Sequence, residues 1–194
     1  MSKKDIKRKV MRISLLGDSG VGKTCIINKY LYDKFSEIQQ SSIGIEKNEK
    51  RLKMNDGIEL KVIIWDTAGQ ERFKAMSTNT IKGAQGIVLV FDNTKKTSFE
   101  SLPTWIKEAK EVKDNIPIVL FGNKCDLLDK TEVEKDEAEE FAKDHQMEYF
   151  ETSAKENINI ENGFKSIIDK AYETAQEEDG IDLKKPTKKK KSKC

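Results

Sequence analysis

The chain has 194 residues, of which 36% are charged and 36% hydrophobic, and a formal net charge of +2. This length suits one domain of ordinary size, and the small net charge argues against strong nucleic-acid binding by the body of the protein. Three widely separated cysteines form no disulfide framework or zinc spacing, which favours a reducing cytosolic compartment. No apolar run approaches the roughly 18 residues of a membrane span, and residues 1–9 lack the apolar core of a signal peptide.

The first quarter of the chain begins with a basic lead over residues 1–9. The apolar run at residues 10–16 predicts a buried strand, and the helix expected after the glycine loop spans about residues 23–32. Residues 45–54 are polar for a strand, but the Asn-Asp-Gly that follows them is a strong hairpin signal. We therefore expect a hairpin that leads into a second apolar strand at residues 60–65.

The rest of the domain alternates strands with helices. Apolar runs at residues 87–91 and 116–121 predict buried strands. Thr97 and Glu100 have capping-box spacing, so we expect Thr97 to cap the helix between these strands. The remaining predicted elements are a helix that carries Phe141 and Ala142, a strand at residues 149–151 and a helix at residues 160–175.

This alternation predicts a doubly wound α/β domain over residues 10–176, with a mostly parallel six-stranded sheet and helices on both faces. Ligands should bind beyond the carboxyl ends of its strands. From Gln176 onward the composition changes, and seven lysines lie between Lys184 and Lys193. Residues 177–194 are therefore predicted to be a disordered polybasic tail. The terminal Cys194 favours lipidation over a merely solvated run of charge.

The first chemical motif matches G-x-x-x-x-G-K-[ST] and consists of Gly17, Asp18, Ser19, Gly20, Val21, Gly22, Lys23 and Thr24. Its glycines let backbone N–H groups point inward at a phosphate chain, and the following helix adds its positive end. Lys23 would reach the β- and γ-phosphates, and the Thr24 hydroxyl would bind Mg²⁺. Alone, this motif predicts a nucleoside triphosphate of unspecified base, and a plain glycine-rich turn is the alternative.

A second motif, Asn123-Lys124-Cys125-Asp126, follows the penultimate predicted strand. The Asp126 carboxylate can accept hydrogen bonds from the N1–H and exocyclic amine of guanine, whereas adenine would leave it unpaired. Such pairing supports discrimination of roughly 10⁴ to 10⁵. Four residues of this kind could be a simple polar turn, but their position at a strand end favours the recognition of guanine.

A third motif begins at Trp65 and ends an apolar strand. Asp66 can hold a Mg²⁺ shell through water, Gly69 lets a backbone N–H approach the γ-phosphate, and Gln70 can orient an attacking water. We therefore predict a site for GTP and Mg²⁺ in which Gln70 is the catalytic residue.

Together these motifs resemble those of the Ras superfamily of small GTPases, and within it the Rab family. The specific signatures are Trp-Asp-Thr-Ala-Gly-Gln-Glu-Arg-Phe at residues 65–73, Ile-Gly-Ile at residues 43–45 and Glu-Thr-Ser-Ala-Lys at residues 151–155. The resemblance implies the P-loop small GTPase fold. It also implies a guanine pocket completed by Ser153, Ala154 and Lys155, with Lys124 packed over the base.

Further roles follow from the same resemblance. Phe35 matches an aromatic residue that the family places against guanine, and Ser42 matches the switch I hydroxyl that ligates Mg²⁺ in the GTP state. The metal ligands expected are Thr24, Ser42 and Asp66. Besides the glycine loop, the expected nucleotide-binding residues are Cys25, Phe35, Ser42, Asp66, Gly69, Asn123, Lys124, Asp126, Leu127, Ser153, Ala154 and Lys155.

The chain also departs from the Rab pattern. Ser42 stands where the family has threonine, which predicts a weaker packing of the closed switch I. Glu46-Lys47 and Thr80-Ile81 replace residues that are Asp-Phe and a tyrosine pair in typical Rab proteins. Only Trp65 remains of the aromatic triad that Rab proteins present to effectors, so partner choice cannot be copied from familiar members.

The resemblance implies a GTP hydrolase, slow without a GTPase-activating protein, that cycles between GTP- and GDP-bound states to regulate vesicle and membrane traffic. The partners implied are GTP and GDP with Mg²⁺, an exchange factor, a GTPase-activating protein, effectors of switch I and II, a Rab escort protein, a GDI-type carrier and an anionic membrane. No nucleic acid is expected. We expect a cytoplasmic monomer that attaches reversibly to the cytosolic face of an endomembrane through prenylated Cys194.

Two other functions remain open at this point. An ATP-using kinase or ATPase would share the glycine loop, but Asp126 argues against adenine. A GTP-binding module with little turnover and atypical effectors would suit the altered switch I, but Gly69 and Gln70 argue against it.

Overall fold

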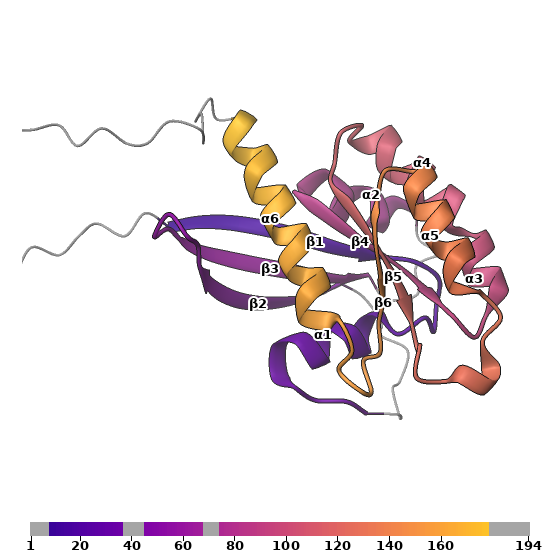
Figure 1. Cartoon of the computed structure of the whole chain (residues 1–194). Helices are drawn as coiled ribbons and strands as arrows, with labels where there is room; N and C mark the ends of the chain where they lie inside the picture. The colour runs from indigo at the N-terminus through magenta and orange to yellow at the C-terminus, as the bar shows by residue number, and fades with distance from the viewer. Residues whose placement is uncertain (1–7, 37–44, 68–73, 179–194) are drawn as a thin grey trace, which may run out of the picture.

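One six-stranded sheet forms the centre of the protein (Figure 1). The structure is a computed structural model, and it describes residues 8–36, 45–67 and 74–178. The strand order is β2-β3-β1-β4-β5-β6, and every neighbouring pair is parallel except the antiparallel pair β2 and β3. The strands are β1 (Arg8–Leu16), β2 (Ile45–Lys53), β3 (Glu59–Thr67), β4 (Gly86–Asp92), β5 (Ile118–Asn123) and β6 (Glu148–Glu151). The predicted doubly wound, mostly parallel sheet is confirmed.

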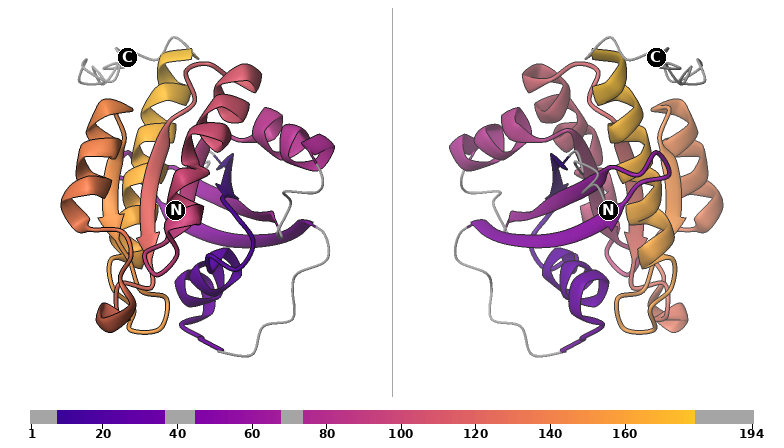
Figure 2. Two further views of the ribbon diagram at one scale, coloured as in Figure 1. Left: turned by 90° about the vertical axis from the view of Figure 1, so that its right-hand side faces the viewer. Right: turned by 90° about the vertical axis from the view of Figure 1, so that its left-hand side faces the viewer.

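Helices cover both faces of the sheet (Figure 2). Two helices, α1 (Lys23–Tyr32) and α6 (Ile160–Glu178), lie on one face. The helices of the other face are α2 (Lys74–Gly83), α3 (Lys96–Glu100), α4 (Leu102–Val112) and α5 (Lys135–Asp144). Among the described residues, no helix is long and apolar enough to cross a membrane.

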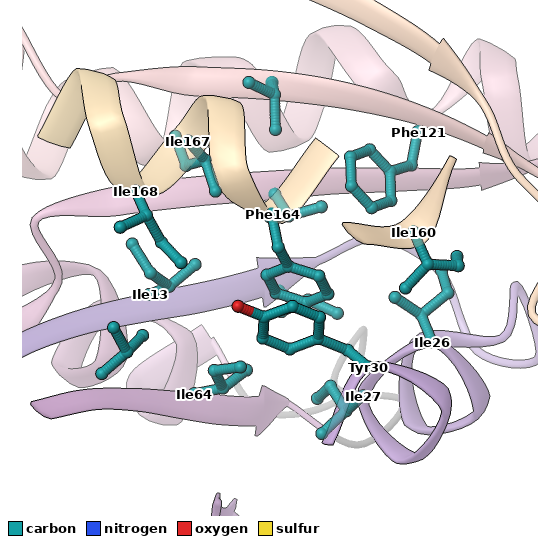
Figure 3. Close-up of a cluster of buried hydrophobic side chains, with 14 of the residues drawn as sticks. Ile13, Ile26, Ile27, Tyr30, Ile64, Phe121, Ile160, Phe164, Ile167 and Ile168 are labelled. Atoms are coloured by element: carbon teal, nitrogen blue, oxygen red, sulfur yellow. The ribbon is translucent and has the colours of Figure 1, made fainter. Parts of the chain in front are cut away.

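The core under α1 and α6 is built by alternation along the strands. Met11, Ile13 and Leu15 of β1 point to this face and are buried, because successive side chains of a strand point to opposite sides. Figure 3 shows the Tyr30 ring from α1 lying over Phe164 from α6, and their ring centroids are 4.0 Å apart at 17°. Burying a side chain of this size contributes roughly 1.5–3 kcal/mol, so the stack holds the two helices together.

The central strand β4 is buried along its whole length. Val88 and Val90 join the core under α1 and α6, whereas Ile87, Leu89 and Phe91 join the core under the other helices. A parallel strand covered on both faces has no solvated side, which explains the continuous apolar run in the sequence.

The predicted helix cap at Thr97 is wrong. Helix α3 begins at Lys96, so Thr97 lies inside the helix. The residue at the N-cap position is Lys95, which has an extended backbone and makes no capping hydrogen bond with its side chain. Instead, Glu132 accepts a hydrogen bond from the backbone N–H of Lys96 at 2.7 Å. A carboxylate from a distant loop satisfies the helix start, so the local capping signal has no role.

Other element boundaries differ by a few residues. The hairpin at Gly57 is confirmed, with φ +81° and a 2.9 Å hydrogen bond from its N–H to the Met54 carbonyl. Strand β5 begins after Pro117, because proline has no N–H to donate to the sheet. Helix α6 runs three residues beyond its predicted end, since no helix breaker occurs before Gly180.

We predict that Gly163→Ala lowers stability although alanine favours helices. A Cβ at this position of α6 would lie 2.2 Å from Cζ of Phe121, whose ring is fully buried. Helix propensity favours alanine by about 1 kcal/mol, but overpacking costs about 1–3 kcal/mol. Urea unfolding should therefore show a net loss of roughly 1 kcal/mol. The control is Asn162→Ala on the exposed side of the same turn, which should not lose stability, and a stabilised Gly163→Ala would contradict the prediction.

Candidate functional site

The motifs of the predicted site that the structure describes gather at one edge of the sheet. The glycine loop follows β1, Asp66 lies one residue before the end of the parallel strand β3, and Asn123 ends β5. Because the carboxyl ends of parallel strands meet at the same edge, these separate motifs form one site. This arrangement is the one that the alternation of elements predicts.

Two glycines of the loop combine a positive φ with a closely approaching neighbour. Gly17 has φ +139°, and a Cβ there would lie 2.1 Å from the Val90 carbonyl oxygen. Gly22 has φ +100°, and a Cβ there would lie 2.3 Å from Nδ2 of Asn123. The left-handed region strains any other residue, and both positions are also closed by neighbouring atoms. The loop is thus held tightly against β4 and the end of β5.

Lys23 closes the glycine loop. Its buried side chain returns from the first turn of α1 to the start of the loop, where Nζ donates to the carbonyls of Gly17 at 2.6 Å and Asp18 at 2.7 Å. Helix α1 has no acidic residue in its first turn. An ammonium group, loop N–H groups and the positive end of a helix in one place make a site for a phosphate chain.

Two of the predicted metal ligands are in contact. The Thr24 hydroxyl donates to Oδ2 of Asp66 at 2.6 Å, and Asp66 is buried. A hydroxyl and a carboxylate are hard oxygen ligands, and Mg²⁺ is commonly bound through one or two such groups together with phosphates. Because the pair lies beside the phosphate-binding loop, Thr24 and Asp66 fit a Mg²⁺ ion that accompanies a nucleotide. Ser42, the third predicted ligand, lies outside the described residues.

The second motif is bonded directly to the first. Asn123 donates through Nδ2 to the Val21 carbonyl at 2.8 Å, and Lys124 donates through Nζ to the Gly20 carbonyl at 3.0 Å. Lys124 also pairs with buried Asp92 at the end of β4. Residues about a hundred positions apart therefore hold the two loops at a defined separation.

Asp126 lies where the loops after β5 and β6 are joined by hydrogen bonds. Its Oδ1 accepts a hydrogen bond from the Ser153 hydroxyl at 2.6 Å, and Ser153 Oγ accepts one from the Glu156 N–H at 3.0 Å. The Cys125 N–H donates to the Thr152 carbonyl at 3.1 Å. The predicted contribution of the segment after β6 to the site is thus supported by its contact with Asp126.

The remaining predicted residues of this region differ in exposure. Ala154 is buried, Leu127 is half-buried at the start of a short 3₁₀ helix (Leu128–Lys130), and Lys155 is exposed. Phe35 is 37% exposed, so the structure does not bury it among the other site residues. Gly69, Gln70 and Cys194 lie outside the described residues, so their predicted roles stay predictions.

The two thiols near the site are held in the neutral form. Burial raises the pKa of Cys25 above its ordinary value. Burial, with the charges of Glu151 and Asp126, raises the pKa of Cys125 to about 11. Both are therefore protonated near neutral pH and lack the thiolate that nucleophilic chemistry requires. We therefore interpret both cysteines as packing residues rather than nucleophiles.

Sequence reasoning missed two features of the site. Asp92 pairs with Lys124, and its position directly after the apolar run at residues 87–91 is a signal that resembles that of Asp66. Trp105 of α4 packs in the hydrophobic core, and it also donates a hydrogen bond to Asp18 at 2.9 Å. No local pattern in the sequence reveals that second contact.

Comparison with known proteins agrees with this geometry. The Ras family matches residues 12–173. Ras-related protein Rab-13 of Rattus norvegicus is 39% identical, and the alignment covers 95% of each chain. Ras-related protein Rab-10 of Diplobatis ommata is 42% identical over 82% of this chain and 80% of its own. Ras-related protein Rab-8A of Bos taurus is 42% identical over 81% of this chain and 76% of its own.

The match spans the glycine loop, the motif at Asn123 and the segment at Ser153, which are the elements that the structure brings together. The fold, the arrangement of the site and the relatives lead to the same assignment. The chain belongs to the Rab proteins of the Ras family, which are small GTPases that hydrolyse GTP and act in membrane trafficking.

Proposed function

We propose that the chain cycles between GTP- and GDP-bound states with Mg²⁺ and controls a step of vesicle traffic. The observation that carries this proposal is the 2.8 Å hydrogen bond from Asn123 Nδ2 to the Val21 carbonyl. It joins a loop suited to a guanine base to a loop suited to phosphates. A ligand that fits both loops at once has a guanine base and a phosphate chain.

Each group of residues has a separate task in this proposal. Loop N–H groups and Lys23 bind the phosphates, and Asp126 accepts the hydrogen bonds of guanine. Thr24 and Asp66 hold Mg²⁺, which supplies neutralisation of the charge on the β- and γ-phosphates. Gln70 orients the attacking water. No arginine is among the predicted site residues, so intrinsic hydrolysis is slow and a partner's arginine can accelerate it by about 10⁵-fold.

The switch follows from the difference between the two nucleotides. Contacts of the γ-phosphate and Mg²⁺ order the segments around Ser42 and Gly69, and hydrolysis releases them. Effectors recognise the ordered state, an exchange factor reloads GTP, and a GTPase-activating protein ends the signal. An escort protein and a GDI-type carrier handle the lipidated form.

Competition with fluorescent GDP tests the proposal. Unlabelled GTP and GDP should displace the probe at concentrations far below those of ATP, and chelation of Mg²⁺ should speed release of the probe. Single-turnover release of phosphate from bound GTP should then be slow but measurable. Equal competition by ATP would refute guanine recognition, and bound GTP that is never hydrolysed would leave only the binding function.

A GTP-binding module with little turnover and atypical effectors is the second candidate. In place of the tyrosine pair of typical Rab proteins, Thr80 and Ile81 in α2 are both buried, with exposures of 2% and 1%. These two positions therefore offer no exposed aromatic side chain to an effector. The single-turnover measurement distinguishes this candidate from the switch.

We also propose that Cys194 is prenylated and that the lysine-rich segment before it assists membrane binding. One lipid chain gives only marginal binding, and a second signal is needed. Each lysine near an anionic surface adds about 1 kcal/mol. Cys194→Ser and a variant with Lys188–Lys191 neutralised should both shift the protein from the membrane to the supernatant fraction of cells. Equal membrane recovery of the parent protein and both variants would contradict this proposal.

A further inference from the structure

The glycine loop contains an acidic residue that phosphate binding does not explain. Asp18 follows Gly17 directly, and its main-chain carbonyl accepts a hydrogen bond from Lys23. A carboxylate inside an anion-binding loop opposes the charge of a phosphate chain. Its presence therefore requires another reason.

Both carboxylate oxygens of Asp18 are bound by the segment that starts α4. Oδ1 accepts a hydrogen bond from Nε1 of Trp105 at 2.9 Å, and Oδ2 accepts one from the Ser101 hydroxyl at 2.9 Å. Ser101 and Trp105 lie 83 and 87 residues after Asp18 in the sequence. Ser101 is the N-cap of α4, so the carboxylate also lies at the positive end of that helix. The charge of Asp18 is thus directed to α4.

Trp105 is the stronger of the two anchors. The residue is 7% exposed, so its indole N–H has little access to water and gains most from a charged acceptor. The Ser101 hydroxyl lies 2.9 Å from both Asp18 Oδ2 and the Thr97 carbonyl, and its single proton serves one of them at a time. Loss of the indole donor should therefore matter more than loss of the hydroxyl.

We infer that Asp18 is a positioning residue, which fixes the start of the phosphate-binding loop to α4 through Trp105 and Ser101 and thereby slows nucleotide release. The Asp18 side chain binds the segment that starts α4, and the Asp18 main-chain carbonyl accepts a hydrogen bond from Lys23. Movement of Asp18 consequently displaces the ammonium group that binds the phosphates. This inference rests on the proposed function, since its effect is on bound guanine nucleotide.

Two opposite effects of Asp18 can be separated by two substitutions. Asp18→Ala removes both the charge and the hydrogen bonds, whereas Asp18→Asn removes the charge but keeps a carbonyl acceptor for Trp105. If anchoring dominates, release of fluorescent GDP at saturating Mg²⁺ should be about tenfold faster for Asp18→Ala. Asp18→Asn should fall between this variant and the parent. If charge repulsion dominates, both variants should release GDP more slowly.

The role of Trp105 is tested by Trp105→Phe, which keeps an aromatic ring but removes the N–H. We expect release about three- to tenfold faster, and a smaller increase for Ser101→Ala. The double variant Asp18→Ala with Trp105→Phe should release GDP no faster than Asp18→Ala alone. A purely structural effect of the ring would instead multiply with that of Asp18.

A spectroscopic signature and a matched control complete the test. In ¹H–¹⁵N spectra, one of the indole resonances of the two tryptophans should shift upfield in Asp18→Ala, because its N–H loses a carboxylate acceptor. Ser166→Ala removes another hydroxyl–carboxylate contact, 2.6 Å to Glu148 at the opposite edge of the sheet, and should leave GDP release unchanged.

A parent protein that does not bind GDP would defeat the proposed function. Tight binding by the parent with unaltered release from Asp18→Ala would overturn this inference alone.

Discussion

Asp126→Asn should change the nucleotide preference of the protein from GTP to xanthosine triphosphate. The carboxylate accepts hydrogen bonds from N1–H and the exocyclic amine of guanine. Asparagine places an amide donor there, which suits the carbonyl of xanthine but opposes the amine of guanine. Because the amide donor would face the amine donor of guanine, affinity for GTP should fall by roughly 10⁴-fold. Competition of both nucleotides against fluorescent GDP or its xanthine counterpart measures the change.

The structure shows why this substitution should not disrupt the loop itself. Ser153 donates to Oδ1 of Asp126, and the carbonyl oxygen of asparagine can accept the same bond. Asp129→Asn, three residues further on an exposed 3₁₀ helix, removes the same charge and is the matched control. It should keep the GTP preference of the parent. An Asp126→Asn protein that still prefers GTP would show that another group reads the base.

Gln70→Leu should nearly abolish hydrolysis while nucleotide binding is retained. The amide of Gln70 is proposed to orient the attacking water, and leucine has neither a donor nor an acceptor. Loss of such an orienting group typically costs about 10²-fold or more in rate. Single-turnover release of phosphate from preloaded GTP measures the loss, and release of fluorescent GDP measures binding in the same preparation.

The two measurements on one variant distinguish catalysis from binding. A group that acts only in the transition state changes the rate constant and leaves ground-state affinity unchanged. Faster GDP release from Gln70→Leu would instead assign this residue to the binding site. Hydrolysis at the parent rate would remove Gln70 from the mechanism and leave the orientation of water to another group.

Local patterns in the sequence determined the order of elements and the chemistry of the site. The apolar run at residues 87–91 predicts a buried strand, and every residue of β4 is indeed buried because helices cover both faces of the sheet there. Gly17, Gly22 and Lys23 predict a phosphate loop because a positive φ and close backbone approach exclude other residues at the two glycines. In each case the constraint is imposed by the fold but falls on consecutive or nearby residues, so it leaves a pattern in a short stretch of sequence.

Tertiary structure alone decided which polar groups pair across the chain. Glu132 binds the N–H of Lys96 in place of the expected cap at Thr97, and Asp18 binds Trp105 on α4. These partners lie 36 and 87 residues apart, and only the packing of helices and loops brings them together. A buried polar group takes whichever donor or acceptor the fold places beside it, since leaving it unpaired costs about 1–3 kcal/mol. The sequence therefore predicts that Asp18 belongs to the loop, but only the fold shows that its side chain anchors the loop to α4.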